Sequence, residues 1–288
     1  MALTVSNFFV PELLADAIAT GFTGMKALWG TDAAIVNTKM PAGKAEVGTS
    51  VKIPYFGNVG EWQDVGTDGT AITGVSLTST PQTATVKQAA NAIERTLWTE
   101  LAAYAGGDPY EIAAKQIVEG FARRIDTELI TAAQDSTGWS ALTHDISAIG
   151  GGTIDYDAVV NARMKWGDEQ DNIALMVVSS KVFGDMYKLK DSTGRPLLTN
   201  INEGGLAKFV GIPVGVSDRI TPSSSVYTNL LLKKGALVAW INGSPLQLSN
   251  NDPYKGTLID SWHAFFCAHR YNPMPGFSKG GVVRLLTK

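Results

Sequence analysis

The chain has 288 residues, of which 44% are hydrophobic and 18% are charged, and its formal net charge is −3. This composition excludes a disordered chain and a strongly cationic nucleic-acid binder. At this length, one or two domains with a sizeable core are expected.

A single cysteine, Cys267, excludes an intrachain disulfide and a four-thiolate zinc site, and it suits a reducing compartment. Lys26 is the first cation, and Glu12 and Asp16 interrupt the apolar run before it, so a secretory signal is not indicated. No segment approaches the roughly 20 apolar residues of a membrane span, so a soluble protein is expected. The 30 glycines and 12 prolines favour many turns and strands over a helical bundle.

The first predicted element is a short amphipathic helix over residues 11–28. Leu14, Ile18 and Phe22 recur every four residues, with Leu13 beside them. Two glycines within the segment weaken this helix. The sequence leaves open whether it packs on its own domain or on a neighbouring molecule.

Residues 48–87 have a different texture. Val51, Ile53 and Tyr55 alternate with other residues as in a strand, and a second strand is expected before Lys87. Between them the chain is polar, rich in threonine and repeatedly interrupted by glycine. The pattern predicts two strands that flank a long excursion.

This excursion is poor in groups that could form a core. From residue 57 to residue 71 the only large apolar side chains are Val59, Trp62 and Val65, too few to offset the entropic cost of ordering the segment. A hairpin with about 15 residues per side would reach about 50 Å. Such an arm needs another surface to lie on, and the alternative is an ordinary surface hairpin with a flexible tip.

The clearest predicted element is a helix that begins at Asp108. Asp108 can cap it, Pro109 suits the first helical position, and Glu111 can complete a capping box. An apolar stripe continues to about residue 133, which gives a rod about 37 Å long. Just upstream, residues 89–104 are also compatible with a helix.

The next part of the chain predicts a compact α/β unit. Helices are expected over 155–166 and 180–189, with a strand buried on both faces over 173–178. Residues 190–206 are polar and turn-rich, which favours an exposed loop. Further strands are expected at 209–216, 227–232, 236–241, 257–271 and 281–286, with a turn-rich stretch at 250–256. The end of the chain is expected to return to the sheet near the long helix.

The only cluster that resembles a metal site is His263, Cys267 and His269. On a strand, all three side chains project to one face. Residues four apart on a strand are separated by about 13 Å, however, which is too far for one zinc ion. We therefore expect hydrogen-bonded imidazoles and a buried thiol in place of a metal site.

No other motif predicts catalysis or a cofactor. Residues 138–142 lack the second glycine of a nucleophile elbow, and no phosphate-binding loop occurs. His144 lies beside Asp145 but has no nucleophile that sequence can assign to it. The densest basic pairs, at 123–124 and 233–234, predict at most weak, sequence-independent contact with DNA. The acidic residues of the excursion could hold Ca²⁺ weakly, although a solvated acidic tip is the simpler interpretation.

The order of these elements resembles the major capsid protein of tailed bacteriophages, which has the Hong Kong 97-type fold. The resemblance covers the whole chain and depends on element order and texture, without a short invariant motif. It is clearest in the segments VKIPYFGNVGEWQDV (51–65), DPYEIAAKQIVEGFARRIDTELI (108–130) and GIPVGVSDRI (211–220). It implies an α+β fold.

The resemblance also implies a division of the chain. Residues 1–45 would be the N-terminal arm and 46–87 the extended E-loop. Residues 88–154 and 250–288 would be a peripheral domain with its spine helix at 108–133, and residues 155–249 an axial domain. The implied arm contacts are Phe8, Phe9, Leu13 and Leu14; the E-loop contacts are Phe56, Val59, Glu61, Trp62, Asp64, Val65 and Asp68; the loop at the capsomer centre contains Lys190, Asp191, Arg195, Asn200, Asn202 and Glu203.

By the same resemblance, the chain would self-assemble into hexamers and pentamers of an icosahedral shell that encloses a double-stranded DNA genome. It would be neither an enzyme nor a membrane protein and would need no cofactor. Its partners would be its own copies, a portal protein, possible separate scaffolding and decoration proteins, and the packaged DNA through non-specific contacts. It would be located in the virion after assembly in the cytoplasm of a bacterial host.

Two departures from the family pattern matter. No lysine occurs between Lys52 and Lys87, so a covalent cross-link through a lysine at the loop tip is excluded. The expected arm begins almost at Met1, which implies a separate scaffolding protein or none. The alternatives are the shell of an encapsulin-like compartment that packages protein, and a soluble hydrolase with an Asp/Glu pair hidden in the α/β unit.

Overall fold

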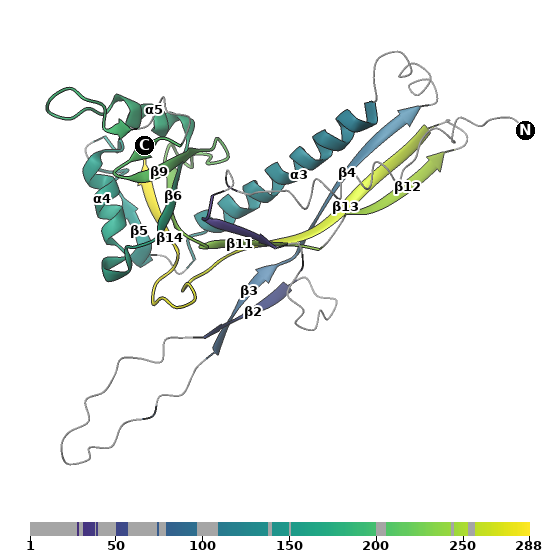
Figure 1. Ribbon diagram of the computed structural model, residues 1–288, viewed down its shortest axis with the longest axis horizontal. Helices are drawn as coiled ribbons and strands as arrows, with labels where there is room; N and C mark the ends of the chain where they lie inside the picture. The colour runs from purple at the N-terminus through teal and green to yellow at the C-terminus, as the bar shows by residue number, and fades with distance from the viewer. Residues whose placement is uncertain are drawn as a thin grey trace, which may run out of the picture.

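A computed structural model describes Leu28, residues 31–37, 39, 50–56, 74, 79–96, 109–137, 140–149, 151–199, 206–242, 245–252 and 257–288. Figure 1 shows an elongated molecule in which a sheet-and-helix unit at one end continues into a long helix beside a narrow sheet. A two-stranded hairpin leaves this narrow sheet at an angle. The mixed architecture confirms the predicted α+β class.

The narrow sheet is organised around one long strand, β13 (Thr257–Arg270). The end of β13 pairs with β11 (Leu237–Ile241), and its beginning pairs along the same edge with β12 (Leu246–Asp252). The other edge of β13 pairs with β4 (Lys87–Thr96), and β1 (Ala34–Asn37) adds a parallel strand to β11. The sheet therefore has five strands, although its outer part consists of only β12, β13 and β4.

The long helix α3 (Pro109–Gln134) covers one face of this sheet. Its Phe121 ring meets the ring of Phe266 on β13 edge-on, with 5.7 Å between ring centroids. Ile117, Ile125 and Leu129 are also buried. The predicted spine helix at 108–133 is thus confirmed to within one residue at each end.

The predicted helix at 89–104 is wrong over residues 89–96, which form most of β4. Alanine-rich sequence favours a helix in isolation, but β4 pairs with β13 in register from Lys87 opposite Phe266 to Thr96 opposite Thr257. Ala89 and Ile93 also pack against the hydrophobic core. Tertiary pairing therefore overrides the local preference, and residues 97–104 lie outside the described residues.

The second sheet has seven strands in the order β5–β14–β10–β6–β9–β8–β7. Their bounds are β5 Thr143–Asp145, β14 Val282–Thr287, β10 Tyr227–Lys233, β6 Ile173–Val178, β9 Ile212–Val216, β8 Lys208–Phe209 and β7 Leu198–Thr199. The buried strand predicted at 173–178 is confirmed as β6. The strand predicted at 209–216 is divided into β8 and β9, because the chain turns at Val210 and Gly211, which both have positive φ.

Two helices pack on this sheet, as predicted. Helix α4 (Tyr156–Met164) begins after Asp155, whose carboxylate accepts a hydrogen bond from the backbone of Ala158. Helix α5 (Ser180–Lys188) is capped in the same way by Ser179. Short 3₁₀ turns occur at Ser140–Leu142 and Gly167–Glu169.

The two sheets share one continuous hydrophobic core. Two connections, from β10 to β11 and from β13 to β14, cross between the sheets side by side. They are tied by backbone hydrogen bonds from Lys233 N to Gly281 O and from Tyr271 N to Ala236 O. The chain end returns to both sheets, because β13 packs on α3 whereas β14 lies beside β10.

Candidate functional site

The base of the hairpin is the best-defined part of the candidate site. Strands β2 (Ser50–Phe56) and β3 (Ser79–Thr85) pair antiparallel, from Ser50 opposite Thr85 to Phe56 opposite Ser79. The predicted strands that flank the excursion are therefore confirmed. Phe56 ends β2, and the other predicted E-loop contacts, Val59, Glu61, Trp62, Asp64, Val65 and Asp68, lie outside the described residues.

Apolar packing fixes the hairpin on the narrow sheet. Ile53 and Ala84 are buried against Val238, Trp240 and Cys267 in a small core of their own. This core lies on the sheet face opposite α3, because Cys267 and Phe266 are consecutive on β13 and point to opposite faces.

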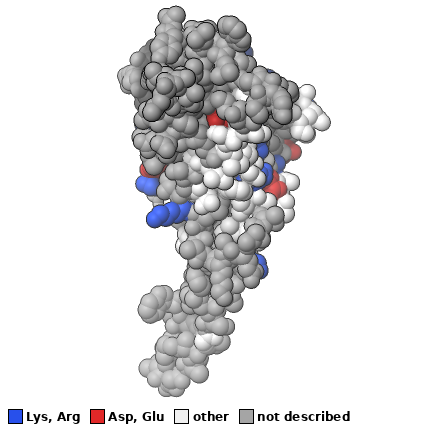
Figure 2. Space-filling view, turned by 90° about the vertical axis from the view of Figure 1, so that its right-hand side faces the viewer, with Lys and Arg blue, Asp and Glu red and all other residues white. Residues whose placement is uncertain are grey.

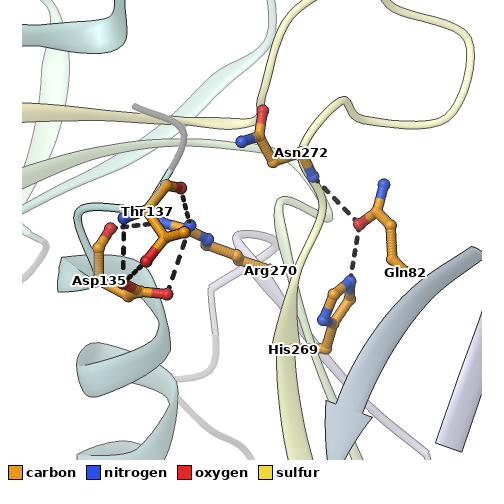
Figure 3. A network of polar contacts seen from close by, with 6 residues as sticks. All are labelled: Gln82, Asp135, Thr137, His269, Arg270 and Asn272. Carbon is orange, nitrogen blue, oxygen red and sulfur yellow. Dashed lines mark hydrogen bonds and ion pairs between the residues drawn. The ribbon is translucent and has the colours of Figure 1, made fainter. Parts of the chain in front are cut away.

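A polar anchor holds the same strand pair. The Gln82 side-chain amide donates to the carbonyl of Pro273 at 3.2 Å, so its oxygen faces His269 and the backbone N–H of Asn272. That oxygen accepts hydrogen bonds from His269 Nε2 at 2.8 Å and from Asn272 N at 3.3 Å (Figure 3). Burial, with a smaller contribution from Arg270, lowers the pKa of His269 to about 4, so the ring is neutral at pH 7.

Arg270, the next residue on β13, anchors the end of α3 on the opposite face. Its guanidinium donates to the backbone carbonyls of Asp135 at 2.5 Å and Thr137 at 2.8 Å, and it pairs with the Asp135 carboxylate at 3.5 Å (Figure 3). Burial lowers the pKa of Arg270 to about 10, which still leaves it charged at neutral pH. Two consecutive residues thus tie the hairpin and the long helix to one strand.

A third polar contact lies where β3 passes into β4. The Lys87 ammonium is 2.5 Å from a Glu128 carboxylate oxygen, and Arg124 pairs with the other oxygen at 2.7 Å. Between this cluster and Arg270 lies a cavity of about 500 Å³, lined by β3, the second half of α3 and β13. The hairpin base is therefore held by polar contacts around a cavity and by a small apolar core.

Beyond the hairpin, the described part of the same sheet face exposes four large apolar side chains among polar ones. Leu246 and Leu248 on β12 are 59% and 51% exposed, and Ile259 and Phe265 on β13 are 39% and 38% exposed. Leu246 pairs with His263 and Leu248 with Ser261, which places these side chains on the face that carries Cys267. The hairpin thus covers one half of the face and leaves the other half exposed.

His263, Cys267 and His269 have the surroundings expected of hydrogen-bonded imidazoles and a buried thiol. His263 is hydrogen-bonded to Gln88 and His269 to Gln82, while Cys267 is buried and burial raises its pKa to about 11. Within the described part of the chain, no group of three histidine, cysteine or acidic side chains is placed to bind a metal ion. The expectation of hydrogen-bonded imidazoles and a buried thiol is confirmed.

The loop after α5 is a tight, exposed turn at its start. One Asp191 carboxylate oxygen accepts hydrogen bonds from the Thr193 backbone and hydroxyl and from the Arg195 backbone, at 2.7–2.8 Å. These bonds lower the pKa of Asp191. Lys190, Asp191 and Arg195 are exposed as predicted. The other capsomer-centre residues (Asn200, Asn202 and Glu203) and the predicted arm contacts (Phe8, Phe9, Leu13 and Leu14) lie outside the described residues.

The described charges form no patch of one sign on the side that Figure 2 shows. On the side shown in Figure 2, basic and acidic side chains lie interspersed among uncharged ones. Of the two basic pairs noted in the sequence, three residues form ion pairs and the fourth is buried. Arg123 and Arg124 pair with Glu119 and Glu128, Lys234 pairs with Asp32, and Lys233 is buried. Among the described helices, none is long and apolar enough to cross a membrane.

Comparison with known proteins agrees with this geometry. The model of the phage capsid family matches residues 35–238, well over half of the chain. The chain belongs to the phage capsid family. Its function is that of a major capsid protein of a tailed phage, a structural role.

Solved structures show the same fold at low sequence identity. The capsid of Ralstonia phage GP4 is 10% identical, with a TM-score of 0.66 and 91% of each chain covered. The capsid of an empty GTA particle is 16% identical, with a TM-score of 0.64 and 88% of each chain covered. A structure of Microbacterium phage Oxtober96 is 13% identical, with a TM-score of 0.62 and coverage of 91% of this chain and 90% of that chain. The predicted Hong Kong 97-type fold is confirmed, and no curated protein matches this sequence.

Sequence reasoning missed the residues that anchor the hairpin and the end of the long helix. Gln82, Glu128 and Arg270 are single polar residues whose partners lie far away in the sequence. Only Arg270 carries a weak sequence signal of its role. It is a charged residue at the end of a long, mostly apolar strand, and a charged side chain there needs a partner if it is buried.

Proposed function

We propose that this capsid protein forms rings of five and six copies that close into an icosahedral shell around double-stranded DNA, and that residues 46–87 of each copy lie on a neighbouring copy. The observation that carries the proposal is the divided face of the narrow sheet. Its inner half is covered by β2 and β3 of the same chain. Its outer half presents Leu246, Leu248, Ile259 and Phe265 to solvent, and the arm of a neighbour would cover them.

The energetics favour an arm that lies on a neighbouring copy. From residue 57 to residue 71 the excursion contains only Val59, Trp62 and Val65 as large apolar groups, too few for a core of its own. Covering four side chains that are already about half buried would contribute about 1 kcal/mol each. Such a contact is modest alone, but a closed shell repeats it in every copy, which stabilises the whole assembly.

The two sheets suggest which part of the subunit plays which role. We assign the seven-stranded sheet with α4 and α5 to the axial domain, and the five-stranded sheet with α3 to the peripheral domain. By strand pairing, β11 would belong to the peripheral domain and β14 to the axial domain. The turn at Lys190, Asp191 and Arg195 would lie near the capsomer centre.

Further partners follow from the capsid role as proposals. A portal protein would replace one ring, separate scaffolding or decoration proteins could bind the shell, and packaged DNA would be contacted without sequence preference. Residues 1–45 would act as an arm between copies. Assembly would take place in the cytoplasm of a bacterial host, and the mature protein would be in the virion. Each of these proposed steps is a non-covalent contact, so the role would need no catalysis.

Size-exclusion chromatography and electron microscopy of the purified full-length chain test the proposal. Closed icosahedral particles or rings of five and six copies are expected. A monomer at all concentrations contradicts the proposal and favours a soluble enzyme. Particles isolated from host cells with protein cargo and no DNA would instead favour an encapsulin-like compartment.

A deletion tests the arm itself. Removing residues 57–74 should leave a folded subunit that cannot assemble, because the sheet contacts of β2 and β3 remain while the contact with the neighbour is lost. Circular dichroism checks folding, and electron microscopy checks assembly. Normal shells formed by the deleted chain would refute the assignment of the arm.

A further inference from the structure

A pocket of about 380 Å³ lies between α3 and the outer part of the narrow sheet. Its walls come from the middle of α3, from β4 and from β13, and Figure 1 shows α3 running along these strands. It opens on the sheet face that carries Phe266, so the sheet separates it from the hairpin and from the exposed apolar side chains of the other face. Its volume is within the range of roughly 300–1,000 Å³ that is usual for small-molecule sites.

The pocket exists because small residues meet there. Ile117, Gly120 and Phe121 line it from one face of α3. Ile117 and Phe121 are buried, whereas a Cβ placed on Gly120 would have no atom within 4 Å. On the sheet side, Ala89 and Ala264 line the pocket and pair directly across β4 and β13. A glycine on the helix and two alanines on the sheet leave a gap that larger side chains would fill.

One wall of the pocket carries a buried donor without an acceptor. Trp262 lines the pocket and is 3% exposed, and its indole Nε1 has no hydrogen-bond partner in the described part of the chain. Asn91 pairs with Trp262 across the strands, but its side-chain oxygen accepts a hydrogen bond from Ala92 N at 2.9 Å. A buried N–H without an acceptor is unfavourable and rare in native proteins. An acceptor that enters the pocket would satisfy it.

The polarity of the pocket specifies the kind of molecule that fits. Its other long polar side chains are engaged, because Arg124 pairs with Glu128 at 2.7 Å and Gln88 Nε2 lies 3.0 Å from His263 Nδ1. The indole N–H can donate but cannot accept. Burying a carboxylate beside it would cost more than burying a carbonyl, because the nearby cation already has a partner. A neutral oxygen acceptor on an apolar body therefore matches the site.

We propose that this pocket binds a compact, uncharged and mostly apolar molecule that carries a hydrogen-bond acceptor such as a carbonyl oxygen. The apolar body lies between Gly120 and the paired alanines, and the oxygen accepts a hydrogen bond from Trp262 Nε1. The site is formed within one copy of the chain, so it is a binding activity beyond the shell function. A bound molecule stabilises the folded subunit, because it binds only where α3 and the sheet are packed together.

Two probes of the same shape test the site. Acetophenone presents a carbonyl oxygen, and α-methylstyrene has a CH₂ group in its place. Isothermal titration calorimetry of the full-length chain should detect one acetophenone site per chain, and the thermal unfolding midpoint should rise with acetophenone concentration. Absence of acetophenone binding would overturn the site. Because the two probes differ in hydrophobicity, the hydrogen bond is judged by how each affinity changes on mutation.

Trp262→Phe keeps an aromatic ring and removes the donor. It should weaken acetophenone binding roughly fivefold while changing α-methylstyrene binding less than about twofold, since only the ketone loses a hydrogen bond. Trp240→Phe is the matched control, because Trp240 belongs to the small core on the opposite sheet face, and it should change neither affinity. Equal weakening of both probes by Trp262→Phe would overturn the hydrogen bond.

A variant that fills the gap tests the location independently. Gly120 is exposed at the pocket, and Gly120→Leu should abolish binding of both probes because its side chain occupies the space beside the alanines. The control is Gly184→Leu on α5, another helix position where nothing lies within 4 Å of a Cβ, and it should bind both probes normally. Circular dichroism checks that each variant is folded. Undiminished binding by a folded Gly120→Leu chain would overturn the site, whatever the behaviour of Trp262→Phe.

Discussion

Gly281 lies so close to Ala236 that a Cβ at position 281 would be 2.6 Å from the Ala236 Cβ and 2.9 Å from its Cα. These residues belong to the two connections that cross between the sheets. Their close approach accompanies the backbone bonds that tie the connections, including Lys233 N to Gly281 O. The relative position of the seven-stranded and five-stranded sheets therefore depends on a residue without a side chain.

Gly281→Ala should consequently destabilise the subunit. The new methyl group would meet the Cα and Cβ of Ala236, which cannot rotate away. We therefore expect a loss of about 1–3 kcal/mol in the free energy of unfolding. Gly120→Ala is a matched control, because nothing lies within 4 Å of a Cβ there and alanine favours a helix. It should be neutral or stabilising by up to about 1 kcal/mol. Denaturant unfolding measures both, and equal effects would contradict the steric argument.

The anchor of the hairpin makes stability depend on pH. Burial lowers the pKa of His269 from 6.5 to about 4, so between these values the unfolded chain binds more protons than the folded one. Stability is therefore lost as the pH falls from about 6.5 through about 4, by up to about 3 kcal/mol from this residue. The protonated ring would also lie beside the cationic Arg270.

A variant without His269 isolates this contribution. His269→Gln removes the proton-binding group, so its free energy of unfolding should fall less steeply than that of the wild type between pH 6.5 and pH 4. His263→Gln is the control, because that ring is also hydrogen-bonded to a glutamine but lies on the open part of the sheet. Parallel pH profiles for wild type and His269→Gln would show that His269 does not titrate in this way.

Several elements of the fold show what the sequence could and could not predict. The capping residues and the apolar periodicity predicted helix α3, and a short, continuous apolar run predicted strand β6. The sequence did not predict strand β4, because its alanine-rich residues favour a helix locally and form a strand only through pairing with β13. The contact of Gln82 with Asn272 joins residues 190 positions apart, and no local pattern records such a pairing.

Lys233 is a buried cation whose removal should stabilise the fold. It is 1% exposed, its ammonium has no hydrogen-bond partner within the described part of the chain, and it lies 4.3 Å from the centroid of the Phe277 ring and 5.3 Å from that of Trp166. Desolvation lowers its pKa, so the folded state disfavours the charged form. Lys233→Met keeps the volume and removes the charge, and we expect a gain of about 1–3 kcal/mol at pH 7.

The pH dependence distinguishes desolvation from better packing. With a lowered folded pKa, the folded chain binds fewer protons than the unfolded one as the pH rises towards 10.5, so wild-type stability increases there. The advantage of Lys233→Met should therefore shrink between pH 7 and pH 10 in denaturant unfolding. An advantage that stays constant would assign the effect to packing alone.

The divided sheet face allows the arm contact to be tested side chain by side chain. Trp62 is the largest apolar group of the excursion, and Leu248 is half exposed on the face that we propose receives it. Trp62→Ala and Leu248→Ala should each weaken the shell, seen as dissociation at lower denaturant concentration. Neither should change the free energy of unfolding of the isolated subunit by more than about 0.5 kcal/mol, because Leu248 is exposed and we propose that Trp62 packs only on the next copy.

The double variant decides whether the two groups share a contact. If Trp62 lies on the face around Leu248 of the next copy, the two losses will not add, and the coupling energy should be about 0.5–3 kcal/mol. The matched control couples Trp62→Ala with Tyr187→Ala, which lies on α5 beside the seven-stranded sheet, and that pair should be additive within about 0.5 kcal/mol. Additivity of Trp62→Ala with Leu248→Ala would place the arm of the neighbour elsewhere, since side chains that pack together lose much of their shared contact when either is removed.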